Sequence, residues 1–330
     1  MMLPAGDDGF SLVEILVAIA LMAIMTVAVA PQLKYLIGFQ SAADTRNRLS
    51  ELQSGFAAAY LANIGSIEAD PGAEINFGVS GIMAPATAAA GARCSAASGN
   101  FVAWSDYSGH AAASLVDDGY GAPLCIFINP QASMQSNGVT LYYHTVAFVS
   151  TGPNNVLDTG TGLNANGSLL LAGDDSGVLF DGRAFANSNF IVTAGKMRTI
   201  VQALETYYLA RYQADPTRSS SIDYWSDGTG SPDPARWDST NPGNLIGWLP
   251  VAAPMFTGSS TDLASALSLS RDDVTDGYGN VIRFENAGND VRSPDNGVDV
   301  NMTTPPYTAL VSTTLPGNVA YAQAAVGVNN

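Results

Sequence analysis

Residues 9–30 read Gly-Phe-Ser-Leu-Val-Glu-Ile-Leu-Val-Ala-Ile-Ala-Leu-Met-Ala-Ile-Met-Thr-Val-Ala-Val-Ala, and this stretch decides how the chain is built. Between Phe10 and Ala30 the one charged side chain is Glu14. A helix over these residues would be about 31 Å long, which is enough to cross a bilayer. A carboxylate inside lipid is costly, so Glu14 needs a cationic partner. The stretch itself holds none, so we expect the partner to come from another chain or from a new amino group made by cutting this one.

The segment Gly9-Phe10-Ser11-Leu12-Val13-Glu14 resembles the prepilin cleavage and methylation motif of type IV pilins and type II secretion pseudopilins. The resemblance implies that a prepilin peptidase cuts after Gly9 and methylates the new N-terminus at Phe10. It also implies that Glu14 pairs with this amine on a neighbouring subunit of a helical filament. Breaking such a buried pair costs about 3–5 kcal/mol. The alternative, a signal peptide or simple anchor, would place small residues after the apolar run, whereas Gly9 precedes it.

The resemblance also sets the expected partners and location. The partners are other pilin or pseudopilin subunits, the prepilin peptidase, an inner-membrane assembly platform and, before assembly, the membrane. We expect a single-pass inner-membrane protein of a Gram-negative bacterium with its body in the periplasm, which later joins a pseudopilus or an extracellular pilus. Family leaders usually carry Lys or Arg just before the cut, but residues 1–9 carry none and hold Asp7 and Asp8 instead. Either translation starts upstream of Met1, or the large C-terminal body sets the topology.

Composition limits what the body can do. The 330 residues carry a net charge of −16, with 13 basic and 29 acidic side chains. Binding along a phosphate backbone needs clustered Lys and Arg, so we expect no nucleic-acid partner and no role in DNA uptake. Cys94 and Cys125 are the only cysteines, and in an exported body they favour a disulfide. The alternative is two buried free thiols.

A long amphipathic helix is predicted to follow the apolar stretch. Pro31 should kink or loosen it, and many pilins carry a proline at this distance from the cut. Apolar residues then recur at spacings of three and four, and Asp70-Pro71-Gly72 ends the pattern. The members of this stripe are Leu33, Leu36, Ile37, Leu49, Leu52, Phe56, Tyr60 and Leu61.

Strands are predicted at residues 124–128, 139–143 and 145–150, after a loop-rich connection over 72–118. Their β-branched and aromatic residues suit an antiparallel sheet. The order of turns and strands in 117–181 is similar to the sheet region of the major pseudopilin of type II secretion. The predicted fold class is therefore α+β, with a long N-terminal transmembrane and stalk helix packed on an antiparallel sheet.

The pattern then repeats. A second helical stripe includes Met197, Ile200, Leu204 and Tyr208, and the turn Asp-Gly-Tyr-Gly at 118–121 recurs at 276–279. Residues 308–313 echo 146–151. We expect a leader over 1–9, a transmembrane and assembly half-helix over 10–30, a first pilin-like lobe over 31–181, a linker over 182–194, and a second, similar helix-plus-sheet lobe over 195–330 with an insertion at 217–250. The alternative is one large α+β domain with recurrent turn chemistry.

Acidic loops are the candidate metal sites. Asp158, Asp174, Asp175 and Asp181 surround the loop after the third predicted strand. The major pseudopilin binds calcium in a loop at that place, and carboxylate oxygens suit this ion. A second acidic loop holds Asp290, Asp295, Asn296, Asp299 and Asn301. Solvated turn residues are the alternative for both loops, because turns favour Asp and Asn anyway.

Sequence motifs of enzymes are absent: there is no Gly-x-Ser-x-Gly, His-Glu-x-x-His or phosphate-binding Gly-rich loop. His110 and His144 have no metal-ligand spacing, so we expect structural roles for them and no enzymatic activity. A doubled body is bulky for a subunit repeated along a filament, which favours a minor pilin or pseudopilin. The alternative is a pilus-borne adhesin whose second lobe binds a surface or receptor through the 217–250 insertion and its tryptophans.

Overall fold

The structure is a computed structural model, and it describes residues 12–214, 216, 218, 224, 252–257, 263–285, 291–292, 299–300 and 308–327. Its helices are α1 (Leu12–Ile67), α2 (Gly99–Val102), α3 (Ser105–Ser108), α4 (Gly182–Ala214) and α6 (Leu263–Ala266), with 3₁₀ turns η1 (Gly78–Ser80), η2 (Ala112–Leu115) and η3 (Gly152–Asn154). Its strands are β1 (Ile75–Asn76), β2 (Ile82–Met83), β3 (Cys125–Ile128), β4 (Ala132–Ser136), β5 (Val139–Tyr143), β6 (Thr145–Ser150), β7 (Gly162–Leu163), β8 (Leu169–Leu170), β9 (Ser176–Asp181), β10 (Ala252–Pro254), β11 (Arg283–Glu285), β12 (Val291–Arg292), β13 (Asp299–Val300), β14 (Thr308–Leu315) and β15 (Val319–Val326).

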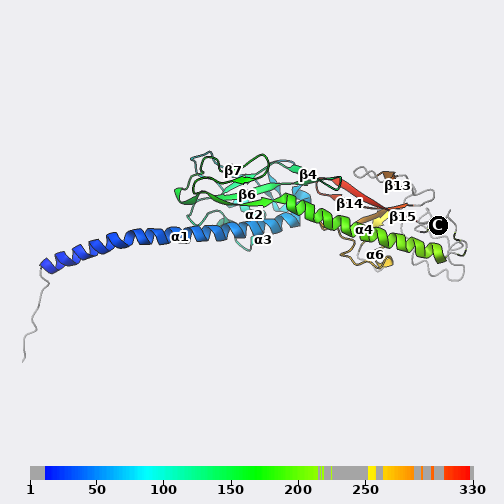
Figure 1. Ribbon diagram of the computed structural model, residues 1–330, viewed down its shortest axis with the longest axis horizontal. Helices are drawn as coiled ribbons and strands as arrows, with labels where there is room; N and C mark the ends of the chain where they lie inside the picture. Colours follow the sequence, from blue (N-terminus) through cyan, green and yellow to red (C-terminus); the bar gives the residue numbers. More distant parts are fainter. Residues whose placement is uncertain are drawn as a thin grey trace, which may run out of the picture.

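Helix α1 is the longest element, and its 56 residues span about 84 Å. Its N-terminal half projects free of every other described element (Figure 1). We expected Pro31 to kink or loosen the helix, but α1 runs through it, and the non-helical dihedrals inside α1 lie at Asn63 (φ −123°, ψ 15°). Within the described part of the chain, no helix combines the length and the apolarity that crossing a membrane requires.

The C-terminal part of α1 packs on an antiparallel sheet of order β3-β6-β9, and we call this assembly the proximal unit. The predicted stripe is confirmed at Leu49, Leu52, Phe56 and Tyr60, which are all buried. It is wrong at Leu36, Ile37 and Leu61, which are exposed. Phe56 meets Trp104, Phe148 and Phe180 with ring centroids 5.0–5.5 Å apart. Such edge-on aromatic contacts stabilise a core beyond the area that they bury.

Helix α4 and the sheet β10-β11-β14-β15 form what we call the distal unit, which continues away from the start of α1 (Figure 1). Residues 182–194, where we expected a linker, are helical and belong to α4. The predicted second stripe is confirmed, because Met197, Ile200, Leu204 and Tyr208 are fully buried. Of the expected insertion at 217–250, only Arg218 and Tyr224 are among the described residues, so its tryptophans lie outside them.

The hairpin β4–β5 connects the two units. We expected β5 in the first sheet, but it pairs with β4 instead, with Leu141 opposite Met134. Val139 and Leu141 are buried in the core of the distal unit together with residues of α4, β11 and β14. A segment that precedes β6 in the chain therefore completes the core of the second unit.

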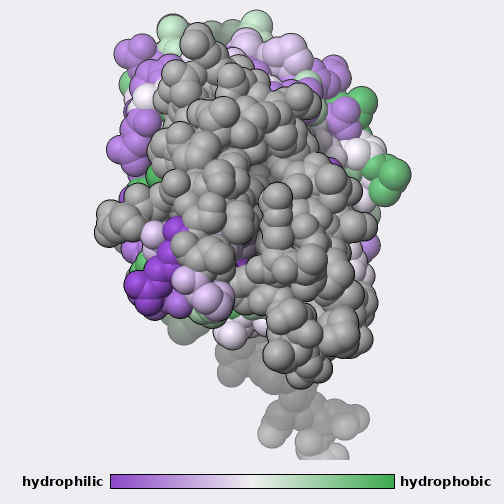
Figure 2. Space-filling model, turned by 90° about the vertical axis from the view of Figure 1, so that its right-hand side faces the viewer, coloured by the Kyte–Doolittle hydropathy of each residue, from purple (hydrophilic) through white to green (hydrophobic). Residues whose placement is uncertain are grey.

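Cys94 and Cys125 form the expected disulfide, which joins the long connection after β2 to strand β3. Viewed from the end opposite the start of α1, the described residues around the edge are mainly hydrophilic, with small separate hydrophobic patches (Figure 2).

Candidate functional site

The acidic loop after β6 brings together three of the carboxylates predicted from sequence. Asp158, Asp174 and Asp175 each offer a carboxylate oxygen, and these oxygens lie within 4.8 Å of one another. The backbone holds the group in place: Asp158 N–H donates to Asp175 Oδ2 at 2.9 Å, and Asp174 N–H donates to Asp158 Oδ2 at 3.1 Å. Asp181, named with them on sequence grounds, forms an ion pair with Arg183 at 3.2 Å instead.

The oxygen chemistry of this loop fits a calcium ion. Oδ1 of Asp175 and Oδ1 of Asn155 are buried and accept no hydrogen bond from any described residue. Burial and the hydrogen-bonding contact with Asp158 raise the pKa of the Asp174 carboxyl above its usual value. A cation bound to the three aspartates would satisfy Oδ1 of Asp175 and offset the repulsion among three carboxylates.

The second acidic loop stays an expectation. Asp290, Asp295, Asn296 and Asn301 lie outside the described residues, and Asp299 begins the two-residue strand β13.

A buried aspartate fastens the Asp-Gly-Tyr-Gly turn of the proximal unit. Asp118 Oδ1 accepts hydrogen bonds from the backbone N–H of Tyr120 at 2.8 Å and of Ala122 at 2.9 Å. Its Oδ2 accepts one from the Ser150 hydroxyl, at the end of β6, at 2.5 Å. We call this set of contacts, in which one aspartate binds the turn and a hydroxyl of the neighbouring strand, the turn latch.

The same contacts occur in the distal unit. Asp276 Oδ1 accepts from the N–H groups of Tyr278 and Asn280, both at 2.8 Å. Its Oδ2 accepts from the Thr313 hydroxyl of β14 at 2.7 Å. The turn latch is thus present twice, each time between a turn and the end of a central strand.

Each latch also holds a helix. Gly119 N–H donates to Thr45 Oγ1 in α1 at 3.0 Å, and Gly277 N–H donates to Thr193 Oγ1 in α4 at 2.9 Å. A Cβ atom on either glycine would come within 2.2 Å of a helix carbonyl oxygen, so only glycine fits at both positions. Sequence reasoning did not single out these threonines. The available signal was that each lies four residues before an apolar residue of the predicted helical stripe, Leu49 or Met197.

A buried network closes the end of α1. His144 Nδ1 lies 3.1 Å from Glu68 Oε1, and Tyr60 donates its hydroxyl to the same carboxylate. His144 Nε2 lies 2.9 Å from the carbonyl oxygen of Gly72. The N–H of Gly182, the first residue of α4, donates to the His144 carbonyl at 3.1 Å. This network joins both long helices to the β5–β6 junction, which is a structural role for His144; the other histidine, His110, pairs with Glu51 at 3.3 Å near the surface.

The processing motif lies at the N-terminus of this framework. Gly9 and Phe10 precede the described residues, and Glu14 lies in the first turn of α1. Residues 6–30 match the family model described as the prokaryotic N-terminal methylation motif, the hallmark of type IV pilins and pseudopilins. The motif supports a type IV pilin-like or pseudopilin subunit that prepilin peptidase processes, and the family of proteins that carry it is structural. Comparisons with curated proteins and with solved structures give no match.

Proposed function

We propose that this protein is a minor subunit of a type IV pilus-like or type II secretion pseudopilus filament. Prepilin peptidase cuts between Gly9 and Phe10 and methylates Phe10, residues 10–30 hold the protein in the inner membrane, and an assembly platform then builds it into the filament. Glu14 pairs with the amine of a neighbouring subunit, and Pro31 lies at the boundary of the assembly half-helix. No enzymatic step by this chain is involved.

One observation carries the proposal: the part of α1 that contains the matched motif projects with its apolar side chains uncovered wherever the structure describes them. Leu12, Leu16 and Met25 expose 76%, 58% and 68% of their surface. Soluble proteins rarely leave a continuous apolar surface of this kind in water. Lipid before assembly, and the helices of neighbouring subunits after it, would cover these side chains.

The doubled turn latch supports a duplicated pilin-like lobe, with the first copy over 31–181 and the second beginning with α4 at Gly182 rather than at the expected residue 195. The distal unit lies beyond the proximal unit, on the side away from the start of α1 (Figure 1). In a filament built by packing α1 helices, that space beside an internal subunit belongs to its neighbours. A subunit at the end of the filament has no such neighbours, so we favour a minor, terminal position.

The substitution Glu14→Ala tests the assembly role. We expect normal insertion and normal cleavage after Gly9, but loss of most incorporation, because the neighbour's amine would be buried without a partner at a cost of about 3–5 kcal/mol. Incorporation is measured by immunoblotting sheared filaments against the membrane fraction. The matched control is Glu51→Ala, which removes an exposed glutamate from the same helix.

Two outcomes would contradict the proposal. Normal incorporation of Glu14→Ala would remove the pairing argument. Immunogold labelling or cryo-microscopy that finds the protein along the entire filament would refute the minor, terminal position.

The distal unit also leaves room for an adhesin, because it would be the outermost part of a terminal subunit. Deleting residues 195–330 distinguishes the two functions: an assembly component loses filaments or secretion, whereas an adhesin keeps filaments and loses attachment. Since the deletion uncovers Val139 and Leu141, the deleted chain should also carry serine at both positions to prevent aggregation.

We further propose that Asp158, Asp174 and Asp175 hold a structural calcium ion. The ion would order the loop beside the sheet of the proximal unit and supply no chemistry of its own.

A further inference from the structure

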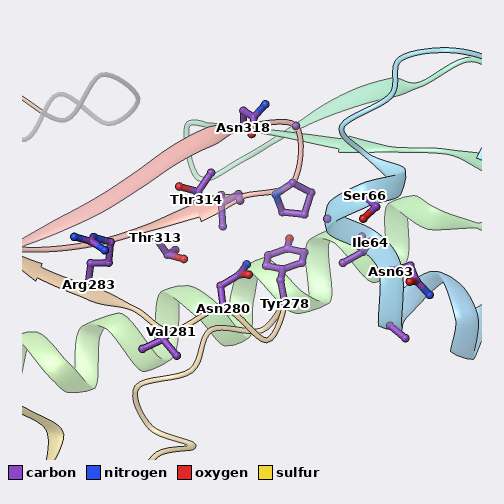
Figure 3. A pocket seen from close by; sticks show the side chains of 15 residues that line it. Asn63, Ile64, Ser66, Tyr278, Asn280, Val281, Arg283, Thr313, Thr314 and Asn318 are labelled. Carbon is purple, nitrogen blue, oxygen red and sulfur yellow. The ribbon is translucent and has the colours of Figure 1, made fainter. Parts of the chain in front are cut away.

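A cavity of about 500 Å³ lies where the end of α1 meets the distal unit. Asn63, Ile64 and Ser66 of α1 form one wall, and Tyr278 stands across from them (Figure 3). Volumes of about 300–1,000 Å³ are typical of sites for small molecules, which often lie between units of a fold. This cavity is separate from the acidic loop and from the methylation motif.

The charge of the cavity differs from that of the chain. Arg283 of β11 is the one charged residue among its described lining residues, although the chain carries a net charge of −16. Its side chain is exposed and forms no ion pair with any residue that the structure describes. A guanidinium in this position favours an anion, and a carboxylate matches its paired N–H groups best.

The remaining polar groups favour a ligand with hydroxyls. The side chains of Ser66, Thr314 and Asn318 line the cavity, and none of them hydrogen-bonds to another described residue. Arg283 lies at the opposite end of the cavity from Asn63, with Thr314 and Asn318 on the wall between them (Figure 3). A ligand can therefore place one anionic end at the guanidinium and donate or accept hydrogen bonds along its length.

The cavity also has apolar and aromatic lining residues, which are Ala62, Ile64, Tyr278, Val281, Leu315 and Pro316. The Tyr278 hydroxyl already donates to the Ala186 carbonyl at 2.8 Å, so this residue offers its ring to the cavity. Strand β14 pairs with β15 along its whole length but with β11 only over residues 310–312, so the cavity-lining residues 313–315 have one strand neighbour among the described residues. The free hydroxyl and amide groups of the lining favour a hydroxylated ligand over an apolar one.

We propose that this cavity binds a hydroxylated carboxylate of the sugar-acid class, with the carboxylate at Arg283 and the hydroxyls facing Thr314 and Asn318. A free sugar acid and a uronic acid residue of a polysaccharide share this chemistry. The site goes beyond the filament role and does not depend on it.

Titration calorimetry on the full chain in detergent tests the site with galacturonate, neutral galactose and trigalacturonate. We expect saturable binding of galacturonate and binding of galactose weaker by about tenfold or more, because a charge-assisted contact is lost. Arg283→Gln should weaken galacturonate binding by a similar factor. Arg93→Gln, which changes an exposed arginine elsewhere, should leave it unchanged.

The other results identify the source or overturn the site. Tighter binding of trigalacturonate than of galacturonate points to a polysaccharide, and equal or weaker binding points to a free sugar acid. Absence of saturable galacturonate binding, equal binding of galactose, or unchanged binding by Arg283→Gln overturns the proposal. Glu14→Ala should bind galacturonate normally. A loss of filament incorporation in this variant can therefore be distinguished from a loss of ligand binding.

Discussion

His144 Nδ1 lies 3.1 Å from Glu68 Oε1, and neither side chain exposes any surface. Burial, the largest influence, lowers the pKa of His144, but the hydrogen bond to Glu68 and its negative charge together raise that pKa above its usual value. The fold therefore favours the charged imidazolium, which pairs with a carboxylate at the point where α1, α4 and β6 meet.

The pair predicts that stability falls as the pH rises. A histidine whose pKa is raised in the folded state contributes stability that is complete below its unfolded pKa of about 6.5. This contribution is lost as the pH rises through the higher folded value, where the imidazole becomes neutral and Glu68 stays buried without a cation. Thermal unfolding between about pH 6 and pH 9 should show a falling midpoint.

His144→Gln should remove most of that pH dependence and cost about 3–5 kcal/mol at pH 6, because one partner of a buried pair is lost. His110→Gln is the control, since its pair with Glu51 is exposed and such pairs contribute about 0–1 kcal/mol. A midpoint that is constant or rises with pH in the unmodified protein would show that the buried pair is not ionised as described.

The two turn latches predict matching mutational effects. Asp118→Ala and Asp276→Ala each leave two backbone N–H groups and a hydroxyl without their acceptor, so each should cost about 3 kcal/mol. Asparagine keeps one acceptor oxygen for the N–H groups, and its amide can donate to the hydroxyl. Asp118→Asn and Asp276→Asn should therefore cost less, about 1 kcal/mol.

Urea unfolding, followed by hydrogen exchange to assign the loss to one unit, measures these effects. A large cost for Asp118→Ala with no cost for Asp276→Ala would mean that the distal turn is not fastened in the same way. In that case the duplicated lobe would lose its main support.

The periodic parts of the fold could be predicted from sequence, and the pairing of strands could not. Phe56 and Tyr208 lie on helical stripes that a local pattern reveals. Strands β4 and β9 were not predicted, because Ser and Gln interrupt the few apolar residues of β4, and Ser, Gly and Asp leave β9 with a run of three apolar residues. Which strand β5 pairs with depends on the distal core, and no local pattern contains that information.

The sequence echo between the units is also displaced by one residue. Aligning identical residue types pairs Ser150 with Ser312. In the structure, however, the residue that corresponds to Ser150 is Thr313, because these two hydroxyls donate to the latch aspartates. The strand registers agree, since Ile126 lies opposite Phe148 and Phe284 lies opposite Val311. A shift of one residue turns a side chain to the other face of a sheet, so buried contacts give the correct alignment and letter identity does not.

Of the candidate sites, those formed by residues close in sequence could be predicted, and those formed by residues far apart could not. The acidic cluster was predicted because its aspartates lie in one loop, and 17 residues separate Asp158 from Asp175. The contact between His144 and Glu68 joins residues 76 positions apart and has no local signal.

Calcium should stabilise the protein through the acidic loop. With free calcium at about one hundred times its dissociation constant, the free energy of unfolding should rise by about 2.7 kcal/mol. Thermal unfolding in calcium, in magnesium and in a chelator measures the effect, and magnesium should give less of it because it dehydrates reluctantly.

Asp175→Asn should abolish most of the calcium effect, since it replaces a buried carboxylate whose Oδ1 has no described hydrogen-bond partner. Asp106→Asn, which changes an exposed aspartate of α3, is the control. If the unmodified protein unfolds at the same temperature in calcium and in chelator, the three aspartates bind no calcium and are solvated turn residues.

The hairpin β4–β5 predicts that a change in the first half of the chain destabilises the distal unit. Leu141 is 2% exposed and belongs to the distal core with Phe190 and Met197 of α4. Leu141→Ala should cost about 2–5 kcal/mol by leaving a cavity there. Limited proteolysis and hydrogen exchange should show faster opening of α4, β14 and β15 than of the proximal sheet. Leu170→Ala is the control, because Leu170 is half-exposed in β8 and its loss should change stability little. Equal loosening of both units would mean that the hairpin belongs to the proximal unit alone.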